Sequence, residues 1–435
     1  MGQLADGAAS RSFLQGLFRT AIAAAHPSAC LPEHLPPPPP KGRLIVLAAG
    51  KAAGSMIEVA ERHYLESQRL APERLAGLGV TRHGYGRPTR LIEVIEAGHP
   101  LPDQAGLAAA ERTLQLADEA GADDLVLVLM SGGASANWIA PAAGVSFPDK
   151  QAVTRALLRS GANIGEMNTV RKHLSRIKGG RLALRAQPAR VVTLAISDVP
   201  GDDPAVIGSG PTGPDPTTLL GARAIVERFR LDLPQSVMHA LADPANETPK
   251  SSEKIFAATT FKLVARPADA FRAAEVSVRE ASYECVLLGD RLEGEARTVA
   301  AEHAQQALAL QAQGRRAVLL SGGELTVTIR GKGRGGPNQE YALALAIALG
   351  GAPGIAALAG DTDGTDGGAG SPDDPAGARI DPATLSRAKA LGLDPAAFLA
   401  DNDSTGFFER LGDLVSTGPT CTNVNDFRAI VIETL

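Results

Sequence analysis

Apolar runs that end in small residues constrain the fold of this chain most strongly. Residues 43–50 read Arg-Leu-Ile-Val-Leu-Ala-Ala-Gly, and similar runs at 124–130 and 190–196 lead into Ser131-Gly132-Gly133 and Ser197-Asp198. A run that is apolar at nearly every position predicts a strand buried on both faces, and helical stretches separate these runs. The first half of the chain is therefore predicted to be doubly wound α/β with a parallel sheet.

The second half predicts a smaller, mixed α/β domain. Between about 234 and 255 the composition shifts to Pro, Ser, Asn and Lys, which indicates a domain boundary or hinge. Strand and helix patterns alternate beyond it. Residues 316–329 read as two β-type runs joined at Gly322-Gly323, and this pattern predicts a hairpin.

We expect the first domain to span residues 1–240 and the second to span 241–435. The late strand at 429–433 is a candidate for returning to the first domain. Residues 10–25 predict an amphipathic helix of the first domain, and the five prolines at 36–40 end it with a stiff, extended connector.

Charge and composition exclude several classes of protein. Hydrophobic residues make up 44% and charged residues 21%, as in globular proteins. The balance of 43 Lys+Arg against 48 Asp+Glu gives a formal net charge of −5, which argues against a nucleic-acid or anionic-lipid partner. An anionic ligand must then be met by a local cluster of cations.

Cysteine usage and hydropathy point to the cytoplasm. The three cysteines lie far apart without CxxC spacing, so neither a disulfide framework nor a thiolate zinc site is indicated. No uninterrupted apolar run reaches the roughly 18 residues of a membrane span. We expect a cytoplasmic protein with no membrane association.

Two polar turns at predicted strand ends are candidate ligand sites. Lys51 opens a helix, where free N–H groups and the helix dipole favour an anion, although the GxxxxGK[ST] spacing of a P-loop is absent. A solvated lysine is the alternative. Residues 131–135 are small enough for a ligand to approach the backbone, and the alternative is a tight turn without a ligand. GxSxG is absent, which argues against a hydrolase.

Two further stretches carry unusual charge. Residues 171–181 contain five Arg or Lys residues and a glycine pair, which suit a small anion such as a carboxylate or phosphate, with a solvated helix face as the alternative. Residues 197–215 form a long loop rich in Asp, Gly and Pro after a buried strand. Its carboxylates could bind Mg²⁺ or orient a hydroxyl group.

The loop at 331–336 formally satisfies GxGxxG, so a nicotinamide enzyme must be considered. Its predicted position after a hairpin argues against the first turn of a βαβ unit, and Lys332 and Arg334 suit phosphates better. Asp361 lies beyond Gly336 at a distance that leaves the dinucleotide alternative open. The Asp361 loop fails the EF-hand pattern but retains carboxylates and hydroxyls suited to Mg²⁺.

Together these strings resemble the class II glycerate 2-kinases, whose C-terminal half carries the MOFRL region. The resemblance runs from about residue 44 to 428 in order, and its motifs lie at 50–52, 131–135, 171–180, 197–202, 208–212, 321–324, 335–340, the Asp361 loop and 417–426.

The resemblance implies a Rossmann-like N-terminal domain, a smaller mixed α/β C-terminal domain and an active site in the cleft between them. It also implies transfer of the γ-phosphoryl group of ATP to the 2-hydroxyl of D-glycerate with Mg²⁺, which gives 2-phosphoglycerate and ADP. Members of the family have been labelled hydroxypyruvate reductases, so an NAD(P)H-dependent reductase is the alternative. A non-catalytic sensor would lack aligned Lys, Asp and Glu groups.

The family's site residues correspond to Lys51, Asp198 and Glu324, with the two carboxylates as candidate Mg²⁺ ligands. Many relatives have an arginine where this chain has Pro337, so the guanidinium role is expected to pass to Arg334. The residues expected to bind the cofactor are Ser131, Gly132, Gly133, Ser135, Lys178, Gly179, Gly210, Gly335, Gly336 and Asn338.

Overall fold

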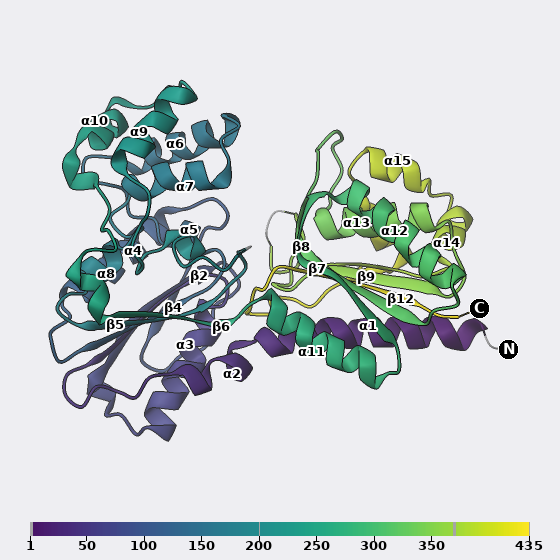
Figure 1. Ribbon diagram of the computed structural model, residues 1–435, viewed down its shortest axis with the longest axis horizontal. Coiled ribbons are helices and arrows are strands. Elements are labelled where there is room, and N and C mark those ends of the chain that lie inside the picture. Colours follow the sequence, from purple (N-terminus) through teal and green to yellow (C-terminus); the bar gives the residue numbers. More distant parts are fainter. Residues whose placement is uncertain (1–2, 200, 369–370, 435) are drawn as a thin grey trace. The chain divides into compact units, whose positions relative to one another are not determined.

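Two groups of residues form separate units in the computed structural model, which describes residues 3–199, 201–368 and 371–434 (Figure 1). The parallel-sheet unit is Cys30–Val264. The mixed-sheet unit combines Met1–Ala29 with Ala265–Leu435. Among the described residues, no helix is both long and apolar enough to cross a bilayer.

The parallel-sheet unit confirms the doubly wound prediction. Its sheet has the order β3-β2-β1-β4-β5-β6, and the first five strands run parallel to their neighbours. Every residue of β1 and β4 is buried, as expected for continuous apolar strands covered on both faces. The strands are β1 (Leu44–Ala49), β2 (Leu75–Arg82), β3 (Glu93–Ala97), β4 (Leu125–Met130), β5 (Arg190–Ile196) and β6 (Thr259–Ala265).

Helices of this unit pack in two groups. One group accompanies the sheet and consists of α3 (Ala53–Arg62), α4 (Gln104–Asp118), α5 (Ala134–Asn137) and α8 (Arg181–Arg185). The other group has its own apolar core, and Figure 1 shows it gathered at one end of the unit. It consists of α6 (Phe147–Arg159), α7 (Ile164–His173), α9 (Leu219–Arg228) and α10 (Gln235–Ala242).

The mixed-sheet unit contains the sheet β11-β10-β9-β12-β8-β7. β7 runs parallel to β8, whereas β12 runs antiparallel to both of its neighbours. The strands are β7 (Glu284–Glu295), β8 (Ala317–Thr326), β9 (Ile355–Asp361), β10 (Gly377–Ile380), β11 (Leu414–Val415) and β12 (Asp426–Ile432).

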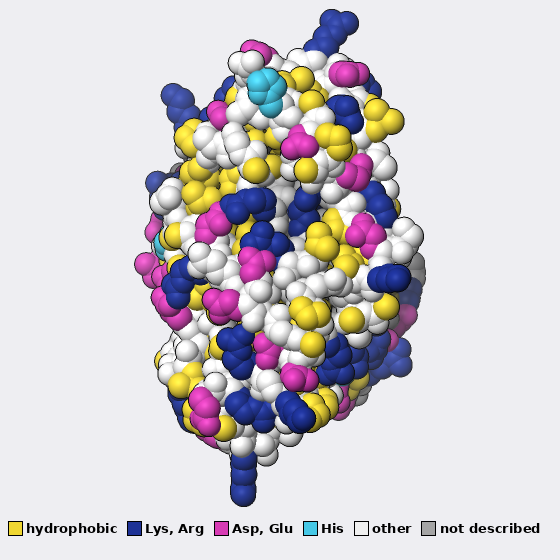
Figure 2. Space-filling view, turned by 90° about the vertical axis from the view of Figure 1, so that its left-hand side faces the viewer, with side chains coloured by type: hydrophobic (Ala, Val, Ile, Leu, Met, Phe, Trp, Pro, Cys, Tyr) yellow, Lys and Arg dark blue, Asp and Glu magenta, His cyan; other side chains and the backbone are white. Residues whose placement is uncertain are grey.

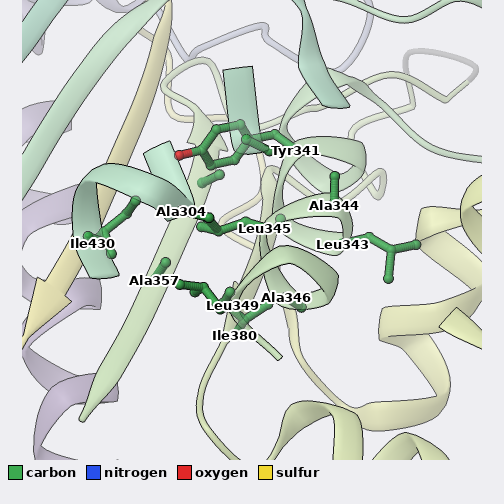
Figure 3. Close-up of a cluster of buried hydrophobic side chains, with 14 of the residues drawn as sticks. Ala304, Tyr341, Leu343, Ala344, Leu345, Ala346, Leu349, Ala357, Ile380 and Ile430 are labelled. Atoms are coloured by element: carbon green, nitrogen blue, oxygen red, sulfur yellow. The ribbon is translucent and has the colours of Figure 1, made fainter. Parts of the chain in front are cut away.

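Helices cover both faces of this mixed sheet. α1 (Gln3–Ala25) and α11 (Pro267–Glu280) lie on one face, and α12 (Ala296–Ala312) and α13 (Pro337–Leu349) lie on the other (Figure 1). Three short helices follow: α14 (Thr384–Ala390), α15 (Pro395–Ala400) and α16 (Ser404–Leu411). Figure 3 shows the core on the α13 side, where Leu345 and Leu349 meet Ala357 of β9.

The structure corrects the expected domain boundaries. The boundary after residue 240 is wrong, because the parallel-sheet unit continues through β6 to residue 264. The late strand does not return to the first domain: β12 lies between β8 and β9. The first 29 residues belong with the C-terminal part, since Phe18 of α1 packs against Phe427 of β12 and Arg11 pairs with Asp381.

The predicted hairpin at 316–329 is also wrong. Residues 317–326 form one continuous strand, β8. The glycine pair permits close approach instead of a turn: a Cβ at Gly323 would lie 2.2 Å from the backbone N and O of Leu292, and one at Gly322 would lie 2.6 Å from the Phe271 ring. A short apolar run with a central Gly-Gly does not by itself distinguish these two uses of glycine.

This packing predicts the effect of adding one methyl group at Gly323. Gly323 has φ +92° and no room for a Cβ, so Gly323→Ala should lower the free energy of unfolding by about 3 kcal/mol. Gly314→Ala is the matched control, because Gly314 also has positive φ (+66°) but nothing within 4 Å of its Cβ position. It should cost only about 1 kcal/mol. Urea denaturation measures both values, and equal losses would contradict the close approach.

Candidate functional site

The two strands at the centre of the parallel sheet define the candidate site. The chain proceeds from β1 through β2 to β3 on one side, and from β4 to β5 on the other, so the strand order reverses between β1 and β4. Open α/β sheets bind ligands outside the carboxyl ends of the strands at such a point. The residues that follow there are Gly50-Lys51 after β1 and Ser131-Gly132-Gly133 after β4.

Hydrogen bonds interlock these two turns. The Lys51 N–H donates to the carbonyl of Gly132 at 2.8 Å, and the Ala52 N–H donates to the hydroxyl of Ser131 at 2.9 Å. Gly50 has φ +115°, and a Cβ on it would lie 2.4 Å from the Ser131 hydroxyl oxygen. The buried Ser131 hydroxyl thus caps the start of α3, which favours the structural alternative for this side chain.

Lys51 and His99 both border Gly133. A Cβ on Gly133 would lie 3.3 Å from Lys51 Cγ and 3.2 Å from His99 Nε2. Sequence reasoning missed His99. It follows β3 as Lys51 follows β1, but Glu93–Ala97 is not a continuous apolar run, so its carboxyl end was not recognised. A lysine and an imidazole therefore stand at one glycine turn.

The structure brings together a second set of predicted residues. Lys178 Nζ donates to the carbonyl of Ser135 at 2.6 Å, and the Ser135 hydroxyl lies 2.6 Å from that of Ser209. The Gly179 N–H donates to the carbonyl of Ser209 at 3.0 Å, and the neighbouring Gly210 has φ +60°. Three segments that are distant in the sequence, around 135, 178 and 209, thus meet beside the end of β4.

Asp198 occupies the corresponding position on the next strand. It is the second residue after β5, and β5 runs parallel to β4, so Asp198 follows the same edge of the sheet as Ser131. Its side chain is partly buried. The acidic loop continues through Pro200, which lies outside the described residues.

The loop that resembles a dinucleotide fingerprint already uses its amides within the protein. The backbone N–H of Gly331 donates to Asn402 Oδ1 at 3.0 Å, and that of Gly333 donates to the Asp401 carbonyl at 2.9 Å. The N–H groups of Arg330, Lys332 and Arg334 also donate to this segment, whose acceptors are Asp401, Asn402 and Asp403. These amides cannot cradle a pyrophosphate while they make these bonds.

The first backbone N–H groups of α13 also donate to a side chain of the protein. Asp366 accepts hydrogen bonds from the N–H groups of Asn338 and Gln339 at 3.0 and 2.8 Å. The side-chain amide of the buried Asn338 also donates to Asp426 at 2.7 Å. Burial, together with the charge of Asp426, raises the pKa of Asp366 to about 7. The helix N-terminus, which would face phosphate in a dinucleotide site, therefore faces a carboxylate.

Other residues predicted for the site differ widely in exposure. Gly335 and Gly336 pack tightly, since a Cβ would lie 2.1 Å from the Ser404 hydroxyl at the first and 2.4 Å from the Asp366 backbone at the second. Arg334 is exposed and pairs with Glu409 at 3.1 Å. Glu324 lies on β8 with an exposed side chain.

Buried ion pairing anchors the basic stretch. Lys172 Nζ lies 3.2 Å from Asp215 Oδ1, and both side chains are almost fully buried. A Cβ on Gly179 would lie 3.2 Å from the other carboxylate oxygen of Asp215. Burial alone would raise the pKa of Asp215, but the charge of Lys172 and the hydrogen bonds from Thr217 hold it below its usual value. This pair fixes the turn that carries Lys178.

Comparisons with known proteins place these features in a family. The model of a domain of unknown function, DUF4147, matches residues 13–242, and the MOFRL family model matches residues 317–426. A provisionally named hydroxypyruvate reductase of Agrobacterium vitis is 47% identical over 429 residues, which cover 97% of this chain and 94% of that protein. The D-glycerate 2-kinase of Thermotoga maritima is 39% identical over 389 residues, covering 88% and 89%.

A solved structure agrees with these sequence matches. The crystal structure of a glycerate kinase from Thermotoga maritima superposes with a TM-score of 0.85 at 37% identity, covering 98% of this chain and 99% of that one.

The anchoring pair generates a prediction about stability. Asp215→Asn leaves Lys172 buried without a counter-charge and should lower the free energy of unfolding by about 3–5 kcal/mol. Asp118→Asn removes a carboxylate from an exposed pair with Arg185 and should cost about 0.5 kcal/mol or less. Urea denaturation at pH 7 compares them.

The pH dependence follows from the lowered pKa of Asp215. The pKa of Asp215 is lower in the folded protein than in the unfolded chain, where it is about 3.9. The ionised carboxylate therefore stabilises the fold above that pH, and this stabilisation is lost as the pH falls through the folded-state pKa. The difference in the free energy of unfolding between wild type and Asp215→Asn should therefore be constant from about pH 5 to 8 and shrink below about pH 4. A difference that grows in acid would contradict the pairing.

Proposed function

Because the chain belongs to the class II glycerate kinase family, we propose that it transfers the γ-phosphoryl group of ATP to the 2-hydroxyl of D-glycerate, giving 2-phosphoglycerate and ADP. The family prediction made from the motifs is thereby confirmed. The observation that carries the choice of reaction is that the backbone N–H groups of Gly331–Arg334 already donate within the protein, since they are then not available to the phosphates of a dinucleotide.

The kinase reaction suits the residues around the end of β1 and β4. Phosphoryl transfer depends mainly on positioning and on neutralising charge, with little covalent chemistry for the protein to perform. Lys51 stands at the start of α3, where the helix dipole also favours an anion. We assign Lys51 to the phosphates or to the glycerate carboxylate, and the small residues Gly132, Gly133 and Ser135 to close approach of the ligand.

The available donors also fit magnesium. Mg²⁺ is usually held by one or two carboxylates together with substrate phosphates and water. Within the described residues, no group of three or more His, Cys, Asp or Glu is placed to hold a metal ion. We propose Asp198 and Glu324 as its carboxylate ligands. When bound, the ion would neutralise charge on the phosphates.

We propose that Arg334 supplies the guanidinium group, because this chain has Pro337 where many relatives have an arginine. Its partner, Glu409, is as exposed as Arg334 itself, so the pair is weak and can exchange for a phosphate or carboxylate. Its backbone N–H is held by Asp403 at 3.1 Å, which fixes the position of the main chain while the side chain stays accessible.

One assay decides between the kinase and the reductase. We expect ADP and 2-phosphoglycerate to form from ATP and D-glycerate with Mg²⁺, and we expect EDTA to abolish the reaction. The same preparation should not oxidise NADH or NADPH with hydroxypyruvate. ATP with Mg²⁺ should also raise the melting temperature, since a ligand bound only to the native state stabilises it. Metal-independent NAD(P)H oxidation without ADP release would establish the reductase instead.

Lys51 provides a second test of the proposed function. Lys51→Ala should lower turnover by about 10²-fold or more, the scale of removing one electrostatic contact to a transition state. Lys41→Ala, which removes an exposed lysine just before β1, is the control and should retain wild-type turnover. Equal melting temperatures would show that both variants fold. Wild-type turnover in Lys51→Ala would refute its role.

A further inference from the structure

The basic residues of the stretch 171–181 differ in what neutralises them. Two have a carboxylate partner, Asp215 for Lys172 and Glu111 for Arg176. Arg181 donates to the carbonyls of Asn246 and Glu247, and the negative charges of Glu247 and Asp215 act on it. Arg171 and Lys178 differ from these, because among the described residues neither pairs with a carboxylate and no negative charge acts on either. The two remaining cations point to a ligand.

Arg171 is the clearer case. It lies in the last turn of α7 and is partly buried, yet its guanidinium makes no hydrogen bond or ion pair with any residue that the structure describes. Burial lowers the pKa of Arg171. The helix dipole favours a cation at this end of α7, but a solvated side chain would serve that purpose without the cost of burial.

Lys178 is the second of these cations, and it is buried. Its ammonium group donates to the carbonyl of Ser135 at 2.6 Å, which uses one of its three N–H groups. Burial lowers the pKa of Lys178 well below its usual range, and the charges of Lys150 and Arg171 lower it further. The carbonyl that it binds belongs to the turn after β4, so Lys178 lies beside the candidate site.

Lys150 is a third cation near Arg171 and Lys178, and the three together form a basic cluster. It is buried on α6, and its ammonium group donates to the carbonyls of Arg171 and Leu174 at 3.1 and 3.0 Å. These bonds satisfy carbonyls at the end of α7 and hold the backbone of Arg171 in place. Burial, together with the charge of Arg171, lowers the pKa of Lys150 to about 7.

Lys150 and Lys178 are buried and Arg171 is partly buried, and none of the three pairs with a carboxylate among the described residues. Burying positive charge without an opposite charge is costly. An oxyanion offsets this cost, and the planar fork of an arginine matches the two oxygens of a carboxylate or phosphate. A cluster kept only for stability would be better paired, as the neighbouring Lys172–Asp215 contact illustrates.

We propose that Arg171 and Lys178 bind an oxyanion group of a reactant, with Lys150 as the residue that positions Arg171. The proposal rests on the proposed function, whose reactants offer two such groups: the carboxylate of the hydroxy acid and the phosphates of the nucleotide. Both share the same chemistry.

The main experiment compares Arg171→Gln with Arg155→Gln. Arg155 is exposed on α6, so its variant removes the same charge from the same group of helices without touching the cluster. Arg171→Gln should raise either the KM for D-glycerate or the KM for ATP by about 10–100-fold, as expected for a lost charge-assisted bidentate contact. Arg155→Gln should change neither.

The constant that changes identifies the source of the oxyanion. A rise confined to D-glycerate assigns the carboxylate, and one confined to ATP assigns a phosphate. Arg171→Lys retains the charge without the planar fork and should recover only part of the affinity. Because the Arg171 guanidinium has no partner among the residues that the structure describes, Arg171→Gln should keep its melting temperature within about 3 °C of wild type. Unchanged KM values for both reactants would overturn the proposal.

A binding measurement separates this proposal from the proposed function. Inorganic phosphate should raise the melting temperature of the wild type and of Arg155→Gln, but not that of Arg171→Gln or Lys178→Met. An Arg171-dependent shift in a protein that does not phosphorylate glycerate would retain the oxyanion site and reject the kinase. An active enzyme whose variants all respond equally to phosphate would reject the site and retain the kinase.

Discussion

The site depends on the interlocked turns that follow β1 and β4. The bonds from the Lys51 and Ala52 N–H groups to Gly132 and Ser131 tie the two central strands together at their carboxyl ends. The strand order reverses there, and open α/β sheets bind ligands outside the carboxyl ends of their strands at such a point. The residues that the chain places at this edge include small residues and a lysine. The Lys178 and Ser209 segments are attached through Ser135, so they depend on the same turns.

Some basic residues of the parallel-sheet unit are neutralised within the protein and others are not. On the face of the molecule drawn in Figure 2, the basic and acidic side chains of the described residues are interspersed, as the small net charge leads one to expect. Inside, Lys172 has a counter-charge, whereas Arg171 and Lys178 have none among the described residues. Proteins commonly give up stability at binding sites in this way, because a group already neutralised by the protein cannot neutralise a ligand.

In the mixed-sheet unit, carboxylates take the places that a nucleotide would occupy in a dinucleotide-binding fold. Asp366 caps α13, and the segment around Asn402 accepts the amides of the glycine loop. The sequence could not distinguish these arrangements, because glycine spacing is the same whether the amides face a phosphate or a neighbouring loop. β8 is one continuous strand and not the predicted hairpin, so the hydrogen bonding of the loop's amides, and not its position after a hairpin, speaks against a dinucleotide.

Local sequence patterns suffice to predict the strand–turn–helix order, the buried parallel strands and the positions of Lys51, Ser131 and Asp198 at strand ends. These are local properties, which apolar periodicity and small turn residues encode directly. Three features become visible only in the folded chain: α1 joins the C-terminal sheet, His99 borders Gly133, and some cations of 171–181 are neutralised while others are not. Those outcomes depend on contacts between residues far apart in the chain, and the local pattern carries no information about such partners.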